Sequence, residues 1–178
     1  MTEPIIKIRN LQTSYGKRKI LRGIDLDIYP YETLVILVLS GCGKSTLLRH
    51  IVGLNKPDEG EIIIKGTDIV TAGEDEQNEV LKKIGMLFQN GALFNSMTVG
   101  ENVGLPLMEH TPQDESNIKI MTRRKLGMVG LSGFENFSPS QLSGGMKKRA
   151  ALARAIAMDP DILFCDEPSA GLDPIVAV

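Results

Sequence analysis

Alternating apolar and polar positions near the start of the chain predict antiparallel strands. Isoleucine and leucine recur at strand-like spacing over 5–8 and over 20–28, and the segment 15–19 between them has the composition of a turn. A further short strand is expected at 62–64, after turn-forming residues at 55–60. The first part of the chain is therefore predicted to form a small antiparallel sheet.

Three other apolar runs are continuous rather than alternating. They cover 33–39, 84–88 and 162–165. Unbroken runs of this length are typical of strands that are buried on both faces of a parallel sheet. Together with the helical segments between them, these runs predict an α/β protein.

Helices are expected in the remaining segments. The segment 74–83 has acidic residues at its start and lysines at its end, which suits the helix dipole. Residues 96–141 have mainly helical character, with breaks at Pro106 and Pro112 and a soft loop at 132–140.

Composition narrows the class of protein. The chain has 178 residues, of which 42% are hydrophobic, so it is expected to form one globular domain. Its 20 basic and 22 acidic residues give a formal net charge of −2, which offers no general reason to bind nucleic acid or an anionic membrane. The two cysteines lack the spacing of a disulfide framework, which indicates a reducing, cytosolic compartment. No signal peptide is expected, and no apolar run is long enough to span a bilayer.

A phosphate-binding loop is predicted where the run at 33–39 ends. The sequence there, SGCGKST, is most of a Walker A motif followed by a helix. Glycines let the backbone N–H groups wrap the phosphates, Lys44 supplies a positive charge, and the Ser45 hydroxyl can enter the shell of Mg²⁺. The residues expected to bind ATP here are Ser40, Gly41, Cys42, Gly43, Lys44, Ser45 and Thr46.

The loop departs from the motif at its first position, where Val38 replaces a glycine. If that position needs a positive φ, a β-branched residue there is costly and ATP affinity falls. The alternative is that Val38 merely extends the strand, and the sequence leaves both open.

A helix with a capping serine is predicted after the soft loop. Ser143 is a good N-cap, and Gly144 and Gly145 leave the first backbone N–H groups accessible to an anion. Small apolar residues fall on one face of this helix at Met146, Ala150, Ala153 and Ala157, and the helix is expected to end at Asp159-Pro160.

Two carboxylates follow the last apolar run. Asp166 and Glu167 lie at the expected carboxyl end of a buried strand, where ligands bind in parallel α/β sheets. One can hold a metal, and the other can polarise a water. Asp173-Pro174 then has the composition of an N-cap and first position of a new helix.

These segments resemble three motifs of ABC-type ATPases: the signature (LSGGM, 142–146), Walker B (ILFCDE, 162–167) and the D-loop (SAGLD, 169–173). The resemblance implies a P-loop NTPase (RecA-like) α/β core with an N-terminal antiparallel β subdomain and an inserted α-helical subdomain. Its expected parts are 1–95, with the β subdomain and Walker A core, 96–141, the helical subdomain, and 142–178, with the other motifs.

The resemblance also implies that 1–178 is a single ABC ATPase domain lacking its C-terminal part. Family members carry a histidine beyond the D-loop, whereas His50 and His110 here both precede the signature and are interpreted as ordinary surface or helix residues.

Roles for single residues follow from the resemblance. Tyr15 would stack on adenine, although an exposed tyrosine is also an ordinary turn residue. Gln89 resembles the Q-loop glutamine, which touches Mg²⁺ or the attacking water. The expected catalytic residues are Glu167, Lys44 and Gln89, and the expected Mg²⁺ ligands are Ser45, Gln89 and Asp166.

The signature is expected to act in trans. In this family two copies enclose ATP, so Ser143, Gly144 and Gly145 of one copy would complete the site of the other. Asp173 of the D-loop is also expected to bind ATP. The implied cofactors are ATP and Mg²⁺, and the implied assembly is a homodimer closed by nucleotide.

Several segments look most like the ATPases of the Mla/Mce group, which move phospholipids or other lipids: FQNGALF (88–94), RAALARA (149–155) and GLDPI (171–175). That likeness implies a membrane permease as partner, an Mce-type substrate-binding protein as an indirect partner, no nucleic acid, and a peripheral place on the cytoplasmic face of the inner membrane. Two alternatives remain: an ATP-binding but hydrolysis-impaired interaction module, and a soluble ABC protein acting on DNA or ribosomes.

Two further groups of residues are candidates for the protein surface. Leu93, Phe94, Met97 and Val99 are candidates for lining the cleft that receives a permease helix, or else ordinary core residues. The basic run 123–125 is interpreted as a solvated helix face.

Overall fold

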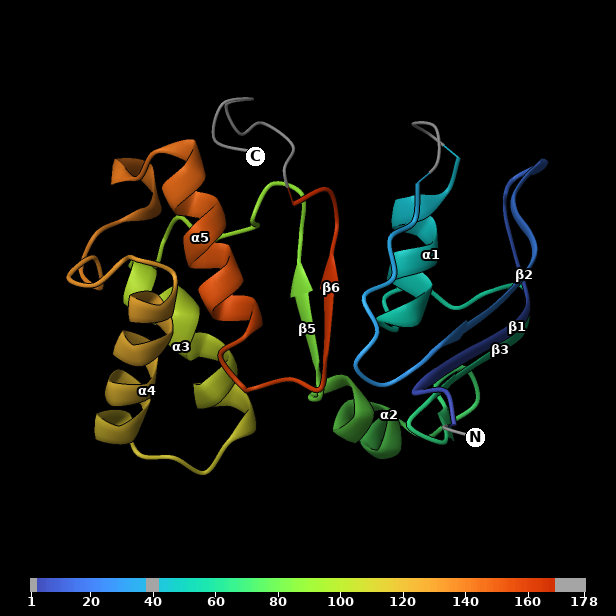
Figure 1. The fold of residues 1–178 in the computed structure, drawn as a ribbon, viewed down its shortest axis with the longest axis horizontal. Helices are drawn as coiled ribbons and strands as arrows, with labels where there is room; N and C mark the ends of the chain where they lie inside the picture. Colours follow the sequence, from blue (N-terminus) through green and yellow to red (C-terminus); the bar gives the residue numbers. More distant parts are fainter. Residues whose placement is uncertain (1–2, 38–41, 169–178) are drawn as a thin grey trace. The chain divides into compact units, whose positions relative to one another are not determined.

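The computed structural model describes residues 3–37 and 42–168. Val38, Ser40, Gly41 and Asp173, to which the sequence assigns roles, lie outside the described residues. The chain divides into two compact units between Leu81 and Lys82. Figure 1 colours the first unit from blue to green and the second from yellow-green to red.

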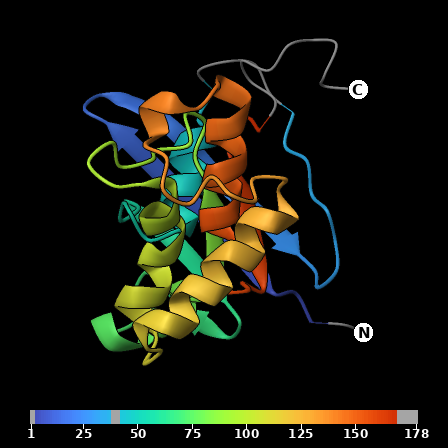
Figure 2. The ribbon, with the colours of Figure 1, turned by 90° about the vertical axis from the view of Figure 1, so that its left-hand side faces the viewer.

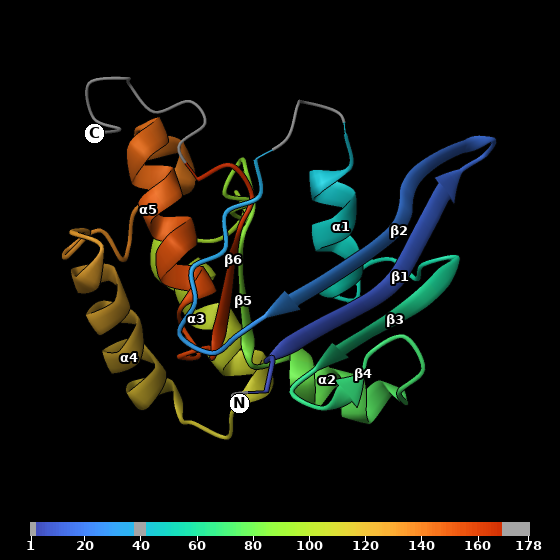
Figure 3. The same ribbon diagram turned by 45° about the vertical axis from the view of Figure 1, so that its right-hand side comes forward.

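An antiparallel sheet forms most of the first unit. Its strands are β1 (Ile6–Tyr15), β2 (Arg18–Ile28), β3 (Glu59–Ile64) and β4 (Thr67–Asp68), in the order β2-β1-β3-β4, as Figure 3 shows. Alternate side chains of β1 are buried, which is the pattern of a sheet with one covered face. The predicted antiparallel strands are therefore confirmed.

The β1–β2 hairpin is closed by a two-residue turn, since Tyr15 pairs with Arg18. Gly16 has a φ of 60°, in the left-handed region that glycine adopts without a steric penalty. The turn is therefore tighter than the segment 15–19 predicted for it.

Two helices complete the first unit, α1 (Lys44–Ile51) and α2 (Glu74–Leu81). The acidic start predicted for α2 is confirmed, but the helix ends before Lys82 and Lys83, so its last turn carries no basic residue. Because β5 begins at Ile84, the two lysines serve as the connection instead.

The strand predicted at 33–39 is wrong for the residues of it that are described. Residues 32–37 have no regular secondary structure, and Val35 and Leu37 are 68% and 87% exposed. An apolar run becomes a buried strand only if neighbouring strands take up its backbone hydrogen bonds. No described strand pairs with 33–37, so the apolar pattern alone was misleading.

The second unit contains the parallel strands β5 (Ile84–Leu87) and β6 (Ile162–Cys165), which confirm the other two predicted strands. Burial of β6 on both faces was wrong, because Leu163 is 43% exposed. Within the described residues β6 pairs only with β5. A strand with one neighbour leaves part of its surface uncovered.

Helices make up the rest of this unit, and Figure 2 shows them in yellow-green, gold and orange. They are α3 (Val99–His110), α4 (Glu115–Met128), the short 3₁₀ helix η1 (Pro139–Gln141) and α5 (Gly144–Ala155). Their shared core includes Val99, Val103 and Leu126 with Ala150 and Ala153 of α5, all of them fully buried. The small apolar face predicted for α5 is thus confirmed as a packing face.

Pro106 does not break the helix, contrary to the sequence prediction. It lies inside α3, between the buried residues Val103 and Leu107. A proline removes one helical hydrogen bond, and packing of the helix on both sides of it offsets that loss. Pro112 does lie between α3 and α4, as expected.

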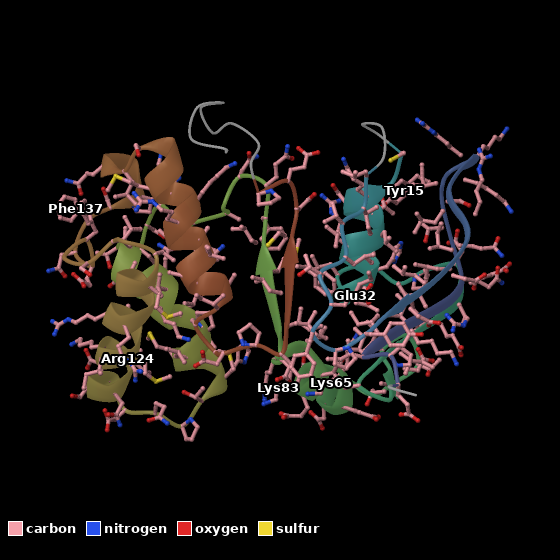
Figure 4. The ribbon with its side chains drawn as sticks, in the orientation of Figure 1. Tyr15, Glu32, Lys65, Lys83, Arg124 and Phe137 are labelled. Atoms are coloured by element: carbon pink, nitrogen blue, oxygen red, sulfur yellow. The ribbon has the colours of Figure 1, made fainter. Side chains whose placement is uncertain are left out.

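The basic run 123–125 is only partly a solvated face. Arg123 and Arg124 are exposed on α4, and Arg124 is labelled in Figure 4. Lys125, however, is 7% exposed and forms an ion pair with Asp159. Its position on the buried side of α4 explains why the interpretation of a uniformly solvated run was wrong for this residue.

Gly85 allows β5 to approach the end of α5. A Cβ atom at this position would lie 2.3 Å from the carbonyl oxygen of Ala155. Gly85→Ala is therefore expected to destabilise the protein by about 2–3 kcal/mol, because backbone atoms must move to admit the methyl group. Urea unfolding measures this loss.

Gly127→Ala is the matched control. Gly127 lies within α4, and a Cβ there would meet its nearest neighbour, Ser132 Oγ, at 3.4 Å. The control should be stabilising by about 0.5–1 kcal/mol, since glycine is a poor helix former. Equal unfolding midpoints for the two variants would contradict the packing account.

Candidate functional site

The first turn of α1 presents backbone N–H groups without a side-chain cap. Its N-cap is Gly43, which has no side chain and has a φ of 109°, so it can turn the chain into the helix where other residues would be strained. Lys44, Ser45 and Thr46 form this first turn, and the Ser45 side chain is exposed. A helix start of this kind favours binding of an anion, phosphate included.

Tyr15 is the last residue of β1, next to the turn of the β1–β2 hairpin, and its side chain is 51% exposed. Its hydroxyl oxygen accepts a hydrogen bond from Asn55 Nδ2 at 3.3 Å. The ring is therefore held at one end and remains accessible for stacking.

His50 links the segments around Tyr15 by hydrogen bonds from a buried position on α1. Of the two interpretations, surface or helix residue, the structure bears out the second: His50 lies in α1 and is buried, with 2% exposure. Nε2 lies 2.8 Å from Thr13 Oγ1, and Nδ1 lies 2.8 Å from the carbonyl oxygen of Asn55. These bonds join α1 to β1 and to the residue that contacts Tyr15. His110, by contrast, is exposed in the last turn of α3.

Gln89 and Glu167 come together in the second unit. The parallel register pairs Leu87 with Cys165, so the residues that follow both strands leave the same edge of the sheet. Gln89 Nε2 donates to Glu167 Oε2 at 2.6 Å. Asp166 is fixed beside them, because its backbone N–H donates to the carbonyl oxygen of Leu87 at 2.9 Å. Two residues 78 positions apart, singled out separately in the sequence, thus share one hydrogen bond.

Ser143 caps α5 as predicted. Its hydroxyl oxygen accepts from the backbone N–H of Met146 at 3.3 Å. Gly144 begins the helix and is exposed, and among the described residues no atom lies within 4 Å of a Cβ added there. Gly145 is partly exposed. The start of α5 is therefore open to an anionic ligand.

The residues expected to bind Mg²⁺ carry oxygen donors, which hard cations prefer. Ser45 belongs to the first unit, and Gln89 and Asp166 belong to the second. Desolvation raises the pKa of the neighbouring Cys165 thiol. In the part of the chain that the structure describes, no cluster of three or more His, Cys, Asp or Glu side chains forms. Mg²⁺ commonly needs only one or two carboxylates when phosphates complete its shell.

The segment that follows Gln89 divides between core and surface. Val99 is fully buried and Leu93 packs against the core, whereas Phe94 is 51% exposed. Met97 is partly buried. Of the four residues considered for a docking cleft, only Phe94 is clearly a surface residue.

Asn102 organises this segment and was not identified from the sequence. It is fully buried on α3, where its side chain accepts from the N–H of Phe94 at 2.7 Å and donates to the carbonyl oxygens of Phe94, Met97 and Thr98. A polar residue at an apolar helix position is the only sequence signal for such a role.

The uncapped start of α1 after Gly43, the acidic pair Asp166-Glu167 after β6, and the glycine-led start of α5 are together typical of a nucleotide-binding cassette. A family model described as ABC transporter matches residues 21–170. The chain therefore belongs to the ABC transporter family.

One similar protein is the probable ribonucleotide transport ATP-binding protein mkl of Mycobacterium leprae, which is 46% identical over 170 residues. The matched region covers 96% of this chain and 49% of that protein. The intermembrane phospholipid transport system ATP-binding protein MlaF of Haemophilus influenzae is 45% identical over 98% of this chain and 66% of its own length. The chain spans about half the length of the mycobacterial relatives.

Solved structures show the same fold. The dimeric structure of MJ0796, a bacterial ABC transporter cassette, matches with a TM-score of 0.88 at 35% identity, covering 97% of this chain and 78% of that one. A second structure of that cassette, described as a post-hydrolysis state bound to ADP and Pi, has a TM-score of 0.87. The predicted P-loop NTPase fold of an ABC cassette is therefore confirmed. Among the described residues, no helix is both long and apolar enough to cross a membrane.

Proposed function

We propose that this chain is the ATP-binding and ATP-hydrolysing part of an ABC transporter that moves phospholipid or another lipid. The observation that carries the proposal is the hydrogen bond between Gln89 and Glu167 at the shared edge of β5 and β6. This bond joins Gln89, which is expected to touch Mg²⁺ or the attacking water, to Glu167, which is expected to act on that water.

The chain would bind ATP chiefly through the start of α1. Backbone N–H groups there and the Lys44 ammonium neutralise phosphate charge, and Tyr15 stacks on the base. Ser45, Asp166 and Gln89 would hold Mg²⁺, which supplies charge neutralisation at the phosphates.

Glu167 would orient the attacking water and accept its proton. Its Oε2 atom already accepts from Gln89, so the carboxylate has a fixed direction before water arrives. Catalysis by the remaining groups consists of positioning and charge neutralisation.

A second copy of the chain would complete the site. Ser143 caps α5 but leaves the first glycine exposed, and this supports a helix start that receives the phosphates of another copy. Closing on ATP and opening after loss of the γ-phosphate would convert hydrolysis into motion.

The cargo and partners are inferred from the named relatives. MlaF proteins are described as parts of intermembrane phospholipid transport systems, which supports a lipid substrate, a membrane permease and indirectly an Mce-type protein as partners. The chain would then lie on the cytoplasmic face of the inner membrane as a peripheral subunit.

Purification of the tagged full-length protein from membranes of its source cell tests this proposal. A multi-spanning permease should co-purify, and added lipid substrate should increase ATP hydrolysis by the complex. A DNA-repair or ribosomal partner, without a permease, would overturn the transporter assignment.

A further inference from the structure

The last turn of α5 is bound to the segment that follows Gln89. Arg154 donates from one guanidinium nitrogen to the carbonyl oxygen of Ala92 at 2.8 Å and from the other to that of Gly91 at 2.8 Å. A guanidinium holds two acceptors in a fixed direction, whereas an ammonium does not.

The two acceptors lie in an unusual turn. Gly91 and Ala92 both have positive φ values, 72° and 49°. A left-handed conformation is unfavourable for alanine and persists only where the surroundings hold it. The N–H of Gly91 donates to the carbonyl oxygen of Phe88 at 2.8 Å, so Gln89 lies within the turn that this bond closes.

Phe94 extends the contact on the other side. The Arg154 guanidinium carbon lies 5.8 Å from the centre of the Phe94 ring, within the range of a cation–π contact. Asn102 fixes the backbone of Phe94 from α3. Burial lowers the pKa of Arg154, because its guanidinium is partly removed from water.

We propose that Arg154 is a positioning residue for hydrolysis: by holding the turn at Gly91 and Ala92 against α5, it sets where Gln89 meets Glu167. This inference rests on the proposed ATPase function. Arg154 acts through the carbonyl oxygens of Gly91 and Ala92, which follow Gln89 by two and three residues. The helix that starts at Ser143 is thereby linked to the turn that contains Gln89.

Arg149 provides a matched control on the same helix. Its guanidinium also donates to two successive carbonyl oxygens, those of Val129 and Gly130, at 3.0 and 3.2 Å. These acceptors follow α4 and are far in sequence from Gln89. Arg154→Lys and Arg149→Lys therefore both replace a guanidinium with an ammonium of equal charge, but only the first affects the turn.

The two variants are compared in the full-length protein by ATP affinity, kcat, thermal stability and amide hydrogen exchange. For Arg154→Lys, kcat should fall about tenfold or more, since small displacements of positioning groups are costly. ATP affinity should stay within about twofold of the unaltered protein, because the phosphate-binding groups are untouched. Exchange in residues 88–95 should accelerate about tenfold without nucleotide, as a charge-assisted bond is lost. Arg149→Lys should keep kcat and the exchange of 88–95 unchanged.

Equal kcat in the two variants, or unchanged exchange in 88–95 of Arg154→Lys, would overturn the proposal. An equal loss of kcat and thermal stability in both would do the same, because it would indicate a general structural role. If the unaltered protein hydrolyses no ATP, the proposed function fails by itself, and the exchange measurement still decides whether Arg154 holds the turn.

Discussion

Glu167→Gln is expected to abolish turnover while ATP still binds. The substitution keeps the length and shape of the side chain, and its carbonyl oxygen can still accept the hydrogen bond from Gln89. What is lost is the negative charge that takes up a proton from water. General-base catalysis contributes typically 10²–10⁴-fold, so kcat should fall by about three orders of magnitude.

Steady-state phosphate release and equilibrium binding of a fluorescent ATP analogue measure the two effects separately. Glu109→Gln, an exposed substitution on α3, is the control and should keep both kcat and affinity. Retention of more than about a tenth of the original kcat in Glu167→Gln would remove Glu167 from the role of general base.

Lys44→Ala is expected to weaken ATP binding itself. Lys44 is the first residue of α1, and its ammonium adds to the positive end of the helix dipole. Charged hydrogen bonds contribute about 1.5–3 kcal/mol each, so the Kd for ATP should rise by roughly 10- to 100-fold.

Isothermal titration with ATP and Mg²⁺ measures this change. Lys56→Ala removes an exposed lysine from the same unit and should leave the Kd unchanged, which separates a local effect from a general effect of charge. An equal rise in Kd for both variants would show that Lys44 does not contact the phosphates.

Local patterns predicted much of the fold. Alternation over 5–8 and 20–28 became β1 and β2, and the runs at 84–88 and 162–165 became β5 and β6. The run at 33–39 failed because burial depends on neighbouring strands, which a local pattern cannot report.

Helix boundaries and charged positions showed the same dependence on tertiary packing. Pro106 stays inside α3 because the helix is held on both sides of it, and Lys125 is buried because Asp159 lies within reach. A propensity or a charge run describes one segment, whereas burial is decided by what packs against it.

The candidate site could be predicted where a polar residue suited to catalysis directly follows a predicted strand. Gln89 and Glu167 each follow an apolar run, and parallel strands bring such ends together. Asn102, His50 and Arg154 were not identified as organising residues, because they bond mostly to backbone carbonyl oxygens, which no sequence motif marks. Arg154 did offer a signal, since it falls four residues after Ala150 and so lies near the apolar face of α5.

The central claim is that ATP held by Lys44 of one copy is enclosed by Ser143 of a second copy. Light scattering on the full-length Glu167→Gln protein tests it most directly, because ATP would remain unhydrolysed. The account predicts a doubled mass with ATP and Mg²⁺ but not with ADP, and no doubling once Ser143→Arg is added, although ATP still binds. A mass that stays at one copy while ATP is bound, or doubling that survives Ser143→Arg, would contradict it.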